Sequence, residues 1–314
     1  MVAVSYTHLP IALALGLVGA AQAQMTIYGL LDASYGKSVF ADSIGEKADF
    51  HSGGDNGSGE GNSTSRVGLK GSTDVGSGLK ANFKLETNGI TSSGDIPSPF
   101  FARQAWVGIS GGFGEVRLGR QDSVSFQTMI PYDFNGASNG VSALGYAGVG
   151  PWLPGRQSRS LQYISPTMGG ATLQLGFVPE GNATGAKNTF SAGATYAAGP
   201  LSVSASYETK RADGGSSFAS VAGSFDFGLA KVMLGYADGA EGVKGVSVGF
   251  VAPVGPVSIG ALYGKNSDTK GYAYEVFVNS EILKGTYAYA EIGKSTEKTG
   301  IKGTGFAVGV IYTF

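Results

Sequence analysis

The chain of 314 residues contains no cysteine, which excludes disulfide frameworks, thiolate metal sites and cysteine nucleophiles together. Charged residues make up only 14% of the chain and the formal net charge is −1, so the basic surplus typical of nucleic-acid binding is missing too. The apolar run over residues 11–21 is far shorter than the ~20 residues that a helix needs to cross a bilayer. We therefore expect no transmembrane helix and no nucleic-acid partner.

Histidine is equally scarce, with one at position 8 and one at position 51. Beyond the first 23 residues, a Ser-His-Asp triad would have to use His51, which lies in a segment rich in Gly, Ser and Asp. No nucleophile motif accompanies it. We therefore expect neither an enzyme nor a cofactor nor a bound metal.

Glycine and aromatic residues are abundant, with 53 Gly, 15 Tyr and 17 Phe. A high glycine content with few charges can indicate disorder, but 42% hydrophobic residues argue against it. Many short alternating runs separated by Gly, Asn, Asp and Ser instead predict extensive β-structure.

The first 23 residues are typical of a secretory signal peptide. The apolar run 11–21 leads into Ala21-Gln22-Ala23, an A-x-A cleavage site, so we expect residues 1–23 to be removed and residues 24–314 to form one domain. Residues 1–8 contain no Lys or Arg, which departs from the usual basic start of such a signal. Export without a transmembrane helix leaves the periplasm, the outer membrane or the medium.

Period-2 alternation recurs along the chain and is clearest at its end, where Phe306, Val308, Val310, Tyr312 and Phe314 share one parity. A soluble β-sandwich gives the same alternation, but the number and length of the runs favour a membrane barrel, whose tilted strands have ~9–11 residues. The predicted strands are 25–36, 62–72, 78–89, 100–111, 114–122, 157–166, 170–179, 188–198, 200–210, 215–227, 229–238, 243–253, 256–265, 271–281, 284–294 and 303–314. Sixteen antiparallel strands form a barrel wide enough for an aqueous lumen.

The connections alternate between tight turns and long loops, which is the asymmetry of a membrane barrel. The longest connection, residues 123–156, is rich in apolar and aromatic residues such as Phe126, Tyr132 and Trp152. We expect this loop to pack against the inner wall of the barrel.

The chain resembles the Gram-negative general-diffusion porins, in the branch found in β-proteobacteria and Neisseria. The likeness rests on Thr26-Ile-Tyr-Gly-Leu-Leu-Asp32, Ser65-Arg-Val-Gly-Leu-Lys-Gly71 with Gly78-Leu-Lys-Ala81, Arg103-Gln-Ala-Trp-Val-Gly108 with Leu118-Gly-Arg-Gln121, the stretch from Arg156 to Tyr163-Ile-Ser-Pro166, and the terminal Phe314. Each motif alone is weak, but their order and spacing agree along the whole mature chain. The resemblance implies a 16-stranded antiparallel transmembrane β-barrel, a homotrimer in the outer membrane, and a long third loop folded into the pore. Phe314 resembles the signal that the outer-membrane assembly machinery reads.

In such a channel, function lies in the constriction and in the charges that line it. The candidate constriction residues are Arg66, Arg103, Arg117, Arg120 and Arg156 from the wall, with Asp133 from the long loop as the counter-charge. Arginine remains charged at every relevant pH and binds carboxylate and phosphate, so we expect a preference for anions. Arg66 and Arg103 match arginines that line the constriction in related porins.

Strand parity does not treat these arginines alike. Arg66 and Arg117 fall on the inward parity, whereas Arg103 shares a side with the apolar Val107. Arg120 falls on the outward parity and requires a bulge or a rim position to reach the lumen. Arg156 lies on the inward parity of its strand, so it is preferred over Arg159. Each of them has the alternative of being only a solvated lumen residue.

The remaining polar strand residues are assigned to the pore wall away from the constriction, and Asp122 is interpreted as a strand-end cap. The wall residues are Lys70, Lys80, Lys84 and Glu86. Tyrosines such as Tyr28, Tyr207 and Tyr312 are expected to face lipid and to form interfacial girdles, with a sugar-stacking path as the alternative.

The predicted function is passive diffusion of small hydrophilic solutes and inorganic anions through the outer membrane of a Gram-negative bacterium. A substrate-specific channel is the nearest alternative, and a surface-exposed β-structured adhesin is another. The partners expected are two further copies of the chain, outer-membrane lipid and the solutes themselves.

Overall fold

The computed structural model describes residues 24–314 apart from 56–59, 151–154, 182–183, 240–242 and 297–300. The expected signal peptide, residues 1–23, lies outside the described residues. Within the part of the chain that is described, no helix is both long enough and apolar enough to cross a membrane.

One antiparallel sheet makes up almost the whole molecule. Apart from the short β2, strands that follow one another along the chain are paired. The strands are β1 (Gln24–Lys37), β2 (Asp49–Ser52), β3 (Arg66–Gly76), β4 (Leu79–Glu86), β5 (Gln104–Gly111), β6 (Gly114–Asp122), β7 (Arg156–Ile164), β8 (Ala171–Val178), β9 (Thr189–Ala198), β10 (Leu201–Glu208), β11 (Phe218–Asp226), β12 (Lys231–Asp238), β13 (Lys244–Val254), β14 (Val257–Asn266), β15 (Tyr272–Leu283), β16 (Thr286–Thr296) and β17 (Lys302–Thr313). The helices are α1 (Ala41–Ile44), α2 (Val124–Met129), the 3₁₀ turn η2 (Ile130–Tyr132) and α3 (Ala143–Tyr146).

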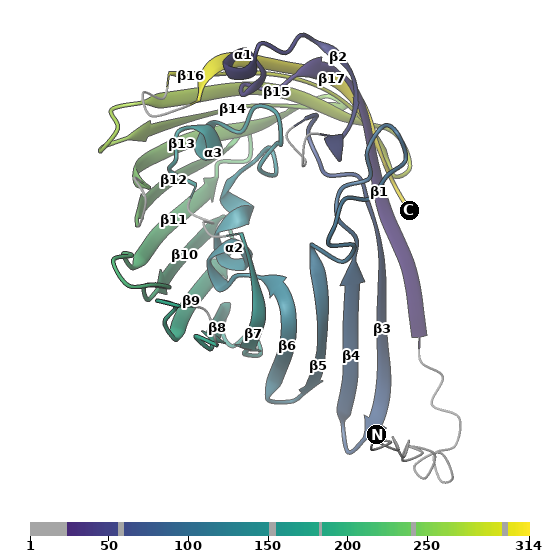
Figure 1. Ribbon diagram of the computed structural model, residues 1–314, viewed down its shortest axis with the longest axis vertical. Coiled ribbons are helices and arrows are strands. Elements are labelled where there is room, and N and C mark those ends of the chain that lie inside the picture. The colour runs from purple at the N-terminus through teal and green to yellow at the C-terminus, as the bar shows by residue number, and fades with distance from the viewer. Residues whose placement is uncertain (1–23, 56–59, 151–154, 182–183, 240–242, 297–300) are drawn as a thin grey trace, which may run out of the picture.

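The sheet closes on itself, because β1 pairs with β3 through residues 24–30 and with β17 through residues 30–37. The last residue continues this seam: the Phe314 amide donates to the Gly29 carbonyl at 3.2 Å, and the Gly29 amide donates to the Phe314 carbonyl at 3.0 Å. Figure 1 shows the resulting ring, with β1 beside β17. β2 is a short strand within the first long loop, so the barrel itself has sixteen strands, as the sequence predicts.

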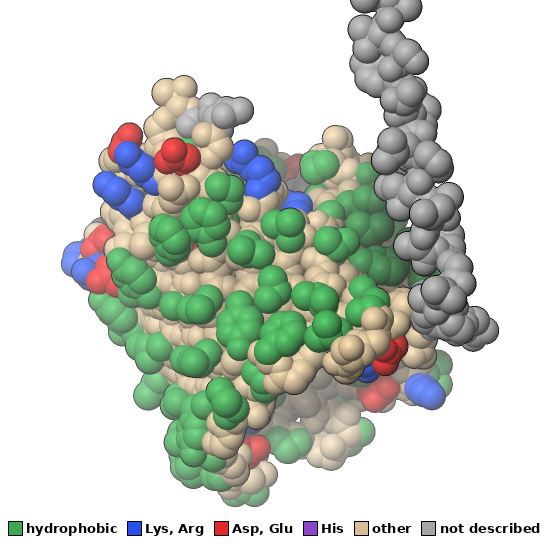
Figure 2. Space-filling model, turned by 90° about the horizontal axis from the view of Figure 1, so that it is seen from below, with side chains coloured by type: hydrophobic (Ala, Val, Ile, Leu, Met, Phe, Trp, Pro, Cys, Tyr) green, Lys and Arg blue, Asp and Glu red, His purple; other side chains and the backbone are tan. Residues whose placement is uncertain are grey.

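Side chains alternate across the barrel wall between an apolar outside and a polar inside. On β10, Tyr207 is half exposed on the outer face, whereas Ser204 and Ser206 are buried on the inner face. Apolar side chains cover much of the outer wall visible in Figure 2, and charged side chains gather toward its edges. This pattern fits a lipid-facing surface around a polar lumen.

Tyr28 is an exception to the predicted girdle and corrects it. Its hydroxyl donates to Glu86 Oε2 at 2.7 Å, and Glu86 is an inward side chain that is 4% exposed. Tyr28 lies on the parity of the buried Asp32, so it faces the lumen rather than lipid. The error arises because β1 alternates less cleanly than the other strands.

The long loop between β6 and β7 lies inside the barrel, as predicted, with α2 against β9 and β10 and α3 against β14 and β15 (Figure 1). Gly193 permits this approach, because a Cβ atom there would lie 2.7 Å from Val124 and 2.8 Å from Thr128. Met129, Leu144 and other loop side chains form an apolar core with wall residues of β11–β15. The loop therefore narrows one side of the lumen.

The first long loop also folds inward and joins the long loop. The Asn139 amide donates to the Asn62 carbonyl at 3.0 Å, and the Gly140 amide donates to the Gly61 carbonyl at 2.9 Å. Asp32 holds the same segment from the wall, since its carboxylate accepts the amides of Asn62 and Ser63. Two loops, rather than one, shape the interior.

Candidate functional site

A cavity of about 520 Å³ lies inside the barrel between the wall and the long loop. The wall side is formed by β3, β4, β6 and β7 and by residues close to their ends, and the opposite side by Phe126, Gly136, Ala137 and Asn139 of the loop. The charged residues that line it are Arg66, Lys84, Glu86, Arg103, Arg120, Asp122 and Arg156. Four of the five predicted arginines thus line this cavity.

Glu86, the last residue of β4, is the centre of the wall's charge network. Its Oε1 atom lies 2.7 Å from Arg103 Nε and 3.8 Å from Arg66 Nε, and its Oε2 atom lies 3.6 Å from Lys84 Nζ. A buried carboxylate with several cationic partners holds those side chains in fixed positions. Glu86 therefore orients Arg66 and Arg103, and both Glu86 and Lys84 lie at the cavity rather than on the wall away from it.

Arg156 connects the wall to the loop. Its Nε atom lies 3.1 Å from Asp122 Oδ1, and its guanidinium lies 5.7 Å from the ring centre of Phe126 on α2. Asp122 is thus an ion-pair partner in the cavity and not only a strand-end residue. The pair fixes one wall arginine beside the loop.

Arg120 reaches the cavity through a bulge. The pairing of β6 with β7 shifts register between Gly119 and Gln121, and Gly119 has a φ of 140°, which favours glycine. The Arg120 guanidinium then donates to the Ala102 carbonyl and, at 2.7 Å, to Ser158 Oγ. The parity of β5 does not determine the direction of Arg103, because Arg103 precedes the first residue of that strand.

Arg117 and Asp133 do not lie where the sequence places them. Arg117 is bound to Glu115 at 2.5 Å and lies 4.5 Å above the Trp106 ring, and it does not line the cavity. Asp133 is 4% exposed and accepts the amide of Asn135 at 3.0 Å behind the loop. Its burial raises the pKa of Asp133 to about 6. The carboxylates that face the arginines are therefore Glu86 and Asp122, and Asp133 anchors the loop.

The other predicted wall residues lie between the cavity and the tight-turn end of the barrel. Lys70 and Lys84 lie 5.3 and 5.6 Å from the ring centre of Tyr28, and both line a second hollow of about 540 Å³. Lys80 is exposed near the turn and pairs in register with Ser110. These lysines extend the basic side of the lumen below the arginines.

Residues of the first loop are the part of the site that the sequence analysis missed. Asn62, Ser63 and Thr64 line the cavity beside Arg66, whose guanidinium donates to the Thr64 carbonyl at 2.7 Å. Small polar residues in a loop carry no periodicity. Their place could be inferred only from the arginine that follows them closely in the chain.

The charge of the cavity lining is unbalanced. Its described residues include five bases, four Arg and one Lys, against two carboxylates, which leaves a formal surplus of three positive charges. The loop side adds no charged residue. This excess gives the cavity a positive electrostatic potential, since the surrounding low-dielectric wall concentrates the field.

The amino-acid sequence is similar to those of known outer-membrane porins. A family model described as Gram-negative porin matches residues 11–300. Outer membrane porin protein 32 of Delftia acidovorans is 32% identical over 227 residues, which cover 68% of this chain and 63% of that protein. An outer membrane porin protein of Bordetella pertussis strain Tohama I is 30% identical over 306 residues, which cover 85% of this chain and 78% of that protein. A major outer membrane protein P.IB of Neisseria meningitidis serogroup B is 30% identical, and the alignment spans only 46% of its length.

Solved structures show the same fold. An anion-selective porin from Comamonas acidovorans matches with a TM-score of 0.72 and 25% identity, over 93% of this chain and 100% of that one. A loop-deleted form of the outer membrane protein OmpT of Vibrio cholerae matches with a TM-score of 0.68 and 17% identity, over 93% of this chain and 99% of that one, which shows the fold alone. The chain therefore belongs to the Gram-negative porin family and is an outer-membrane β-barrel.

Proposed function

We propose that this protein is a channel for passive diffusion of small hydrophilic solutes and ions, with a preference for anions that its arginine-lined constriction sets. The observation that carries the proposal is the surplus of three positive charges around the cavity between wall and loop. The description of the Comamonas relative as anion-selective supports it.

The chemistry of the lining suits this role. Guanidinium groups cannot be deprotonated in proteins, so the field persists across the range of pH in which the bacterium lives. Arg66 and Arg103 are held by Glu86, and Arg156 by Asp122, so the positive charges are fixed before an ion arrives. A prearranged field costs no reorganisation as each anion passes.

The homotrimer that the family resemblance implies is part of the same proposal. Outer-membrane lipid would cover the rest of the outer wall.

A substrate-specific channel is a second candidate, and one observation favours it. Tyr28 and Trp106 present rings on the inner wall beside Lys70, Lys84 and Arg117. Aromatic rings next to cations provide a surface on which a planar organic anion can rest. Such a subsite would slow one class of solute relative to others of the same size.

Liposome swelling distinguishes the two candidates. Purified protein in liposomes is exposed to neutral sugars of increasing size and to organic anions over a range of concentrations. A diffusion channel predicts swelling rates that fall smoothly with solute size and rise linearly with concentration. Saturation with one solute alone would support the substrate-specific channel, and no swelling above protein-free liposomes would contradict both.

A further inference from the structure

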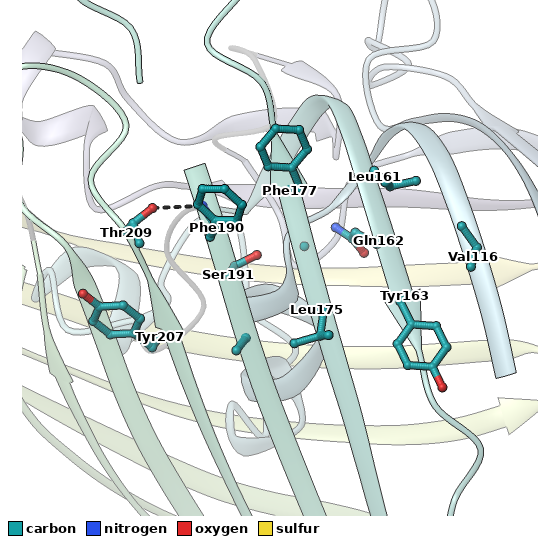
Figure 3. A pocket seen from close by; sticks show the side chains of 12 residues that line it. Val116, Leu161, Gln162, Tyr163, Leu175, Phe177, Phe190, Ser191, Tyr207 and Thr209 are labelled. Carbon is teal, nitrogen blue, oxygen red and sulfur yellow. Dashed lines mark hydrogen bonds between the residues drawn. The ribbon is translucent and has the colours of Figure 1, made fainter. Parts of the chain in front are cut away.

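The outer wall of the barrel carries an apolar hollow of about 500 Å³ over β6–β10, on the opposite side of the wall from the lumen. Figure 3 shows its side chains in two rows, with Leu161, Phe177 and Phe190 in one and Tyr163, Leu175 and Tyr207 in the other. Such a depression on a lipid-facing surface can bind a hydrocarbon chain, because the large side chains around it form its walls.

The strand register explains the hollow. Leu161 lies opposite Phe177 and Phe177 opposite Phe190, whose rings are 5.0 Å apart, so large side chains fill the first row. In the second row Ala192 lies between Leu175 and Tyr207. A methyl group among large neighbours leaves the depression, and the surrounding side chains remain half exposed.

The first row of the hollow lies at the long-loop end of the barrel, which is the extracellular end in this architecture. Phe177 and Phe190 lie one residue from the ends of β8 and β9 at that side, and Thr209 at the rim directly follows β10. An occupant with an apolar chain and a polar head would therefore place its head at the extracellular rim.

The rim above the hollow carries cations. Arg159 lies two residues before Leu161 on β7, and the bulge opposite Arg120 exposes it together with Ser158. Its φ of 56° is unusual for a residue with a side chain, and its guanidinium lies so close to Gly181 in the next loop that a Cβ atom there would clash with it. In the described part of the chain, Arg159 and the exposed Lys210 have no carboxylate within 4.0 Å.

Other rim charges are neutralised in pairs. Lys187 lies 3.0 Å from Asp213, and Arg211 lies 2.6 Å from the buried Glu208. Glu180 is the remaining acidic residue of these loops. Arg159 and Lys210 are thus cations without an ion pair at the head of an apolar hollow, which suits an anionic group attached to a hydrocarbon chain.

We propose that this hollow binds a phosphorylated lipid of the outer leaflet, with one acyl chain along Leu161, Leu175, Ala192 and Phe190 and a phosphate beside Arg159. A lipid fits better than a protein because the hollow lies on the membrane-covered wall and its one polar end lies at the extracellular rim. The site concerns the outside of the barrel and does not depend on the ion preference of the lumen.

The test uses the full mature protein, stripped of lipid in detergent and placed in phosphatidylcholine nanodiscs with a small fraction of diphosphoryl lipid A. Native mass spectrometry then counts the lipid A retained. Ala192→Phe fills the hollow, and Arg159→Gln removes the phosphate partner. Ala261→Phe and Lys265→Gln are the matched controls, since Ala261 lies between Phe250 and Val276 on the outer face of β14 and Lys265 lies at that strand's loop end.

Each hollow variant is expected to weaken lipid A retention roughly ten-fold, because Arg159→Gln removes a charge-assisted contact and Ala192→Phe fills the space for the acyl chain. The two control variants should retain lipid A as the unmodified protein does. Dephosphorylated lipid A should bind the unmodified protein and Arg159→Gln equally. Unchanged single-channel conductance verifies that each variant has folded.

Three results would overturn the proposal. The first is equal retention of lipid A by the unmodified protein and both hollow variants, and the second is retention of lipid A no stronger than that of phosphatidylcholine. The third is a change of subunit number in Ala192→Phe with lipid A retention unaltered, which would assign the hollow to contact between copies of the chain.

Discussion

At the scale of single residues, the cavity between the wall and the long loop is lined by arginines whose positions are fixed by two carboxylates. Glu86 partly neutralises Arg66 and Arg103, and Asp122 does the same for Arg156. The net field is therefore weaker than the number of arginines alone suggests. Under the proposed function, ion selectivity then depends on the few positive charges that the two carboxylates do not neutralise.

Neutralising one of these arginines is expected to reduce anion preference by a definite amount. A unit charge ~7 Å from a passing ion in water contributes about 0.6 kcal/mol, attractive for chloride and repulsive for potassium. Arg66→Gln or Arg103→Gln should therefore lower the ratio of chloride to potassium permeability roughly seven-fold. Arg117→Gln is the matched control, because Arg117 lies outside the cavity. Reversal potentials measure all three, and an equal effect of Arg117→Gln would contradict the assignment.

Strand parity predicts part of this site from sequence. It places Arg66 on the inward face, as observed, but it cannot foresee the bulge that turns Arg120 inward or the end of the strand that frees Arg103. Asp133 misleads because it is the only acidic residue of the long loop, and sequence does not show which side of a loop faces the lumen.

At the scale of elements, the long loop is held by close packing on one side and by buried polar groups on the other. α2 rests on Gly193 and Gly176 of the wall, and Ser138 and Asn135 donate to the buried Glu291 at 2.7 and 2.9 Å. The loop side of the cavity is therefore positioned by contacts far from the arginines.

A larger side chain at the wall position on which α2 packs is expected to displace the loop. Gly193→Val adds atoms where Val124 and Thr128 already lie, and overpacking of this kind costs about 1–3 kcal/mol. We expect a larger, noisier single-channel conductance with lower anion preference. Gly112→Val is the control, because an added Cβ there meets no atom within 4 Å. A conductance identical to that of the unmodified protein would show that the loop tolerates the change.

The stability of the folded protein should also depend on pH, because Asp133 anchors the long loop. Burial raises its pKa from 3.8 to about 6, so the folded state binds the proton more tightly and stability falls as pH rises from about 4 through about 6. A shift of this size corresponds to at most roughly 3 kcal/mol. The thermal midpoint should be higher at pH 5 than at pH 8, and Asp133→Asn should reduce that difference. An undiminished difference would contradict the assignment of the effect to Asp133.

Alternation and turn residues predict the barrel strands well, and the predicted strand 114–122 coincides with β6. They do not predict β2, α1 or the inward fold of the first loop. Those features arise from contacts between loops, such as Asn62 with Asn139, and such contacts leave no periodic pattern in the chain.

At the scale of the whole molecule, the barrel closes where its first strand, β1, meets its last strand, β17. Phe314 exchanges two backbone hydrogen bonds with Gly29, and its ring stacks on Tyr312 with centroids 5.9 Å apart. Closure removes free strand edges, which a membrane barrel requires.

Removing Phe314 is expected to impair assembly more than the stability of the assembled barrel. The terminal aromatic resembles an assembly signal, and its loss deletes one pair of the seam's hydrogen bonds. The yield of heat-modifiable, membrane-inserted protein in cells should fall several-fold, whereas Phe314→Tyr should restore it because both the ring and the backbone bonds are kept. Normal yield without Phe314 would contradict the signal role.

The zero-current potential of the purified protein in a planar bilayer under a KCl gradient tests the central claim most directly. The account predicts stepwise conductance and a potential whose sign corresponds to chloride as the more permeant ion, since the constriction carries a surplus of three positive charges. A potential of the opposite sign would contradict the arginine field as the source of selectivity.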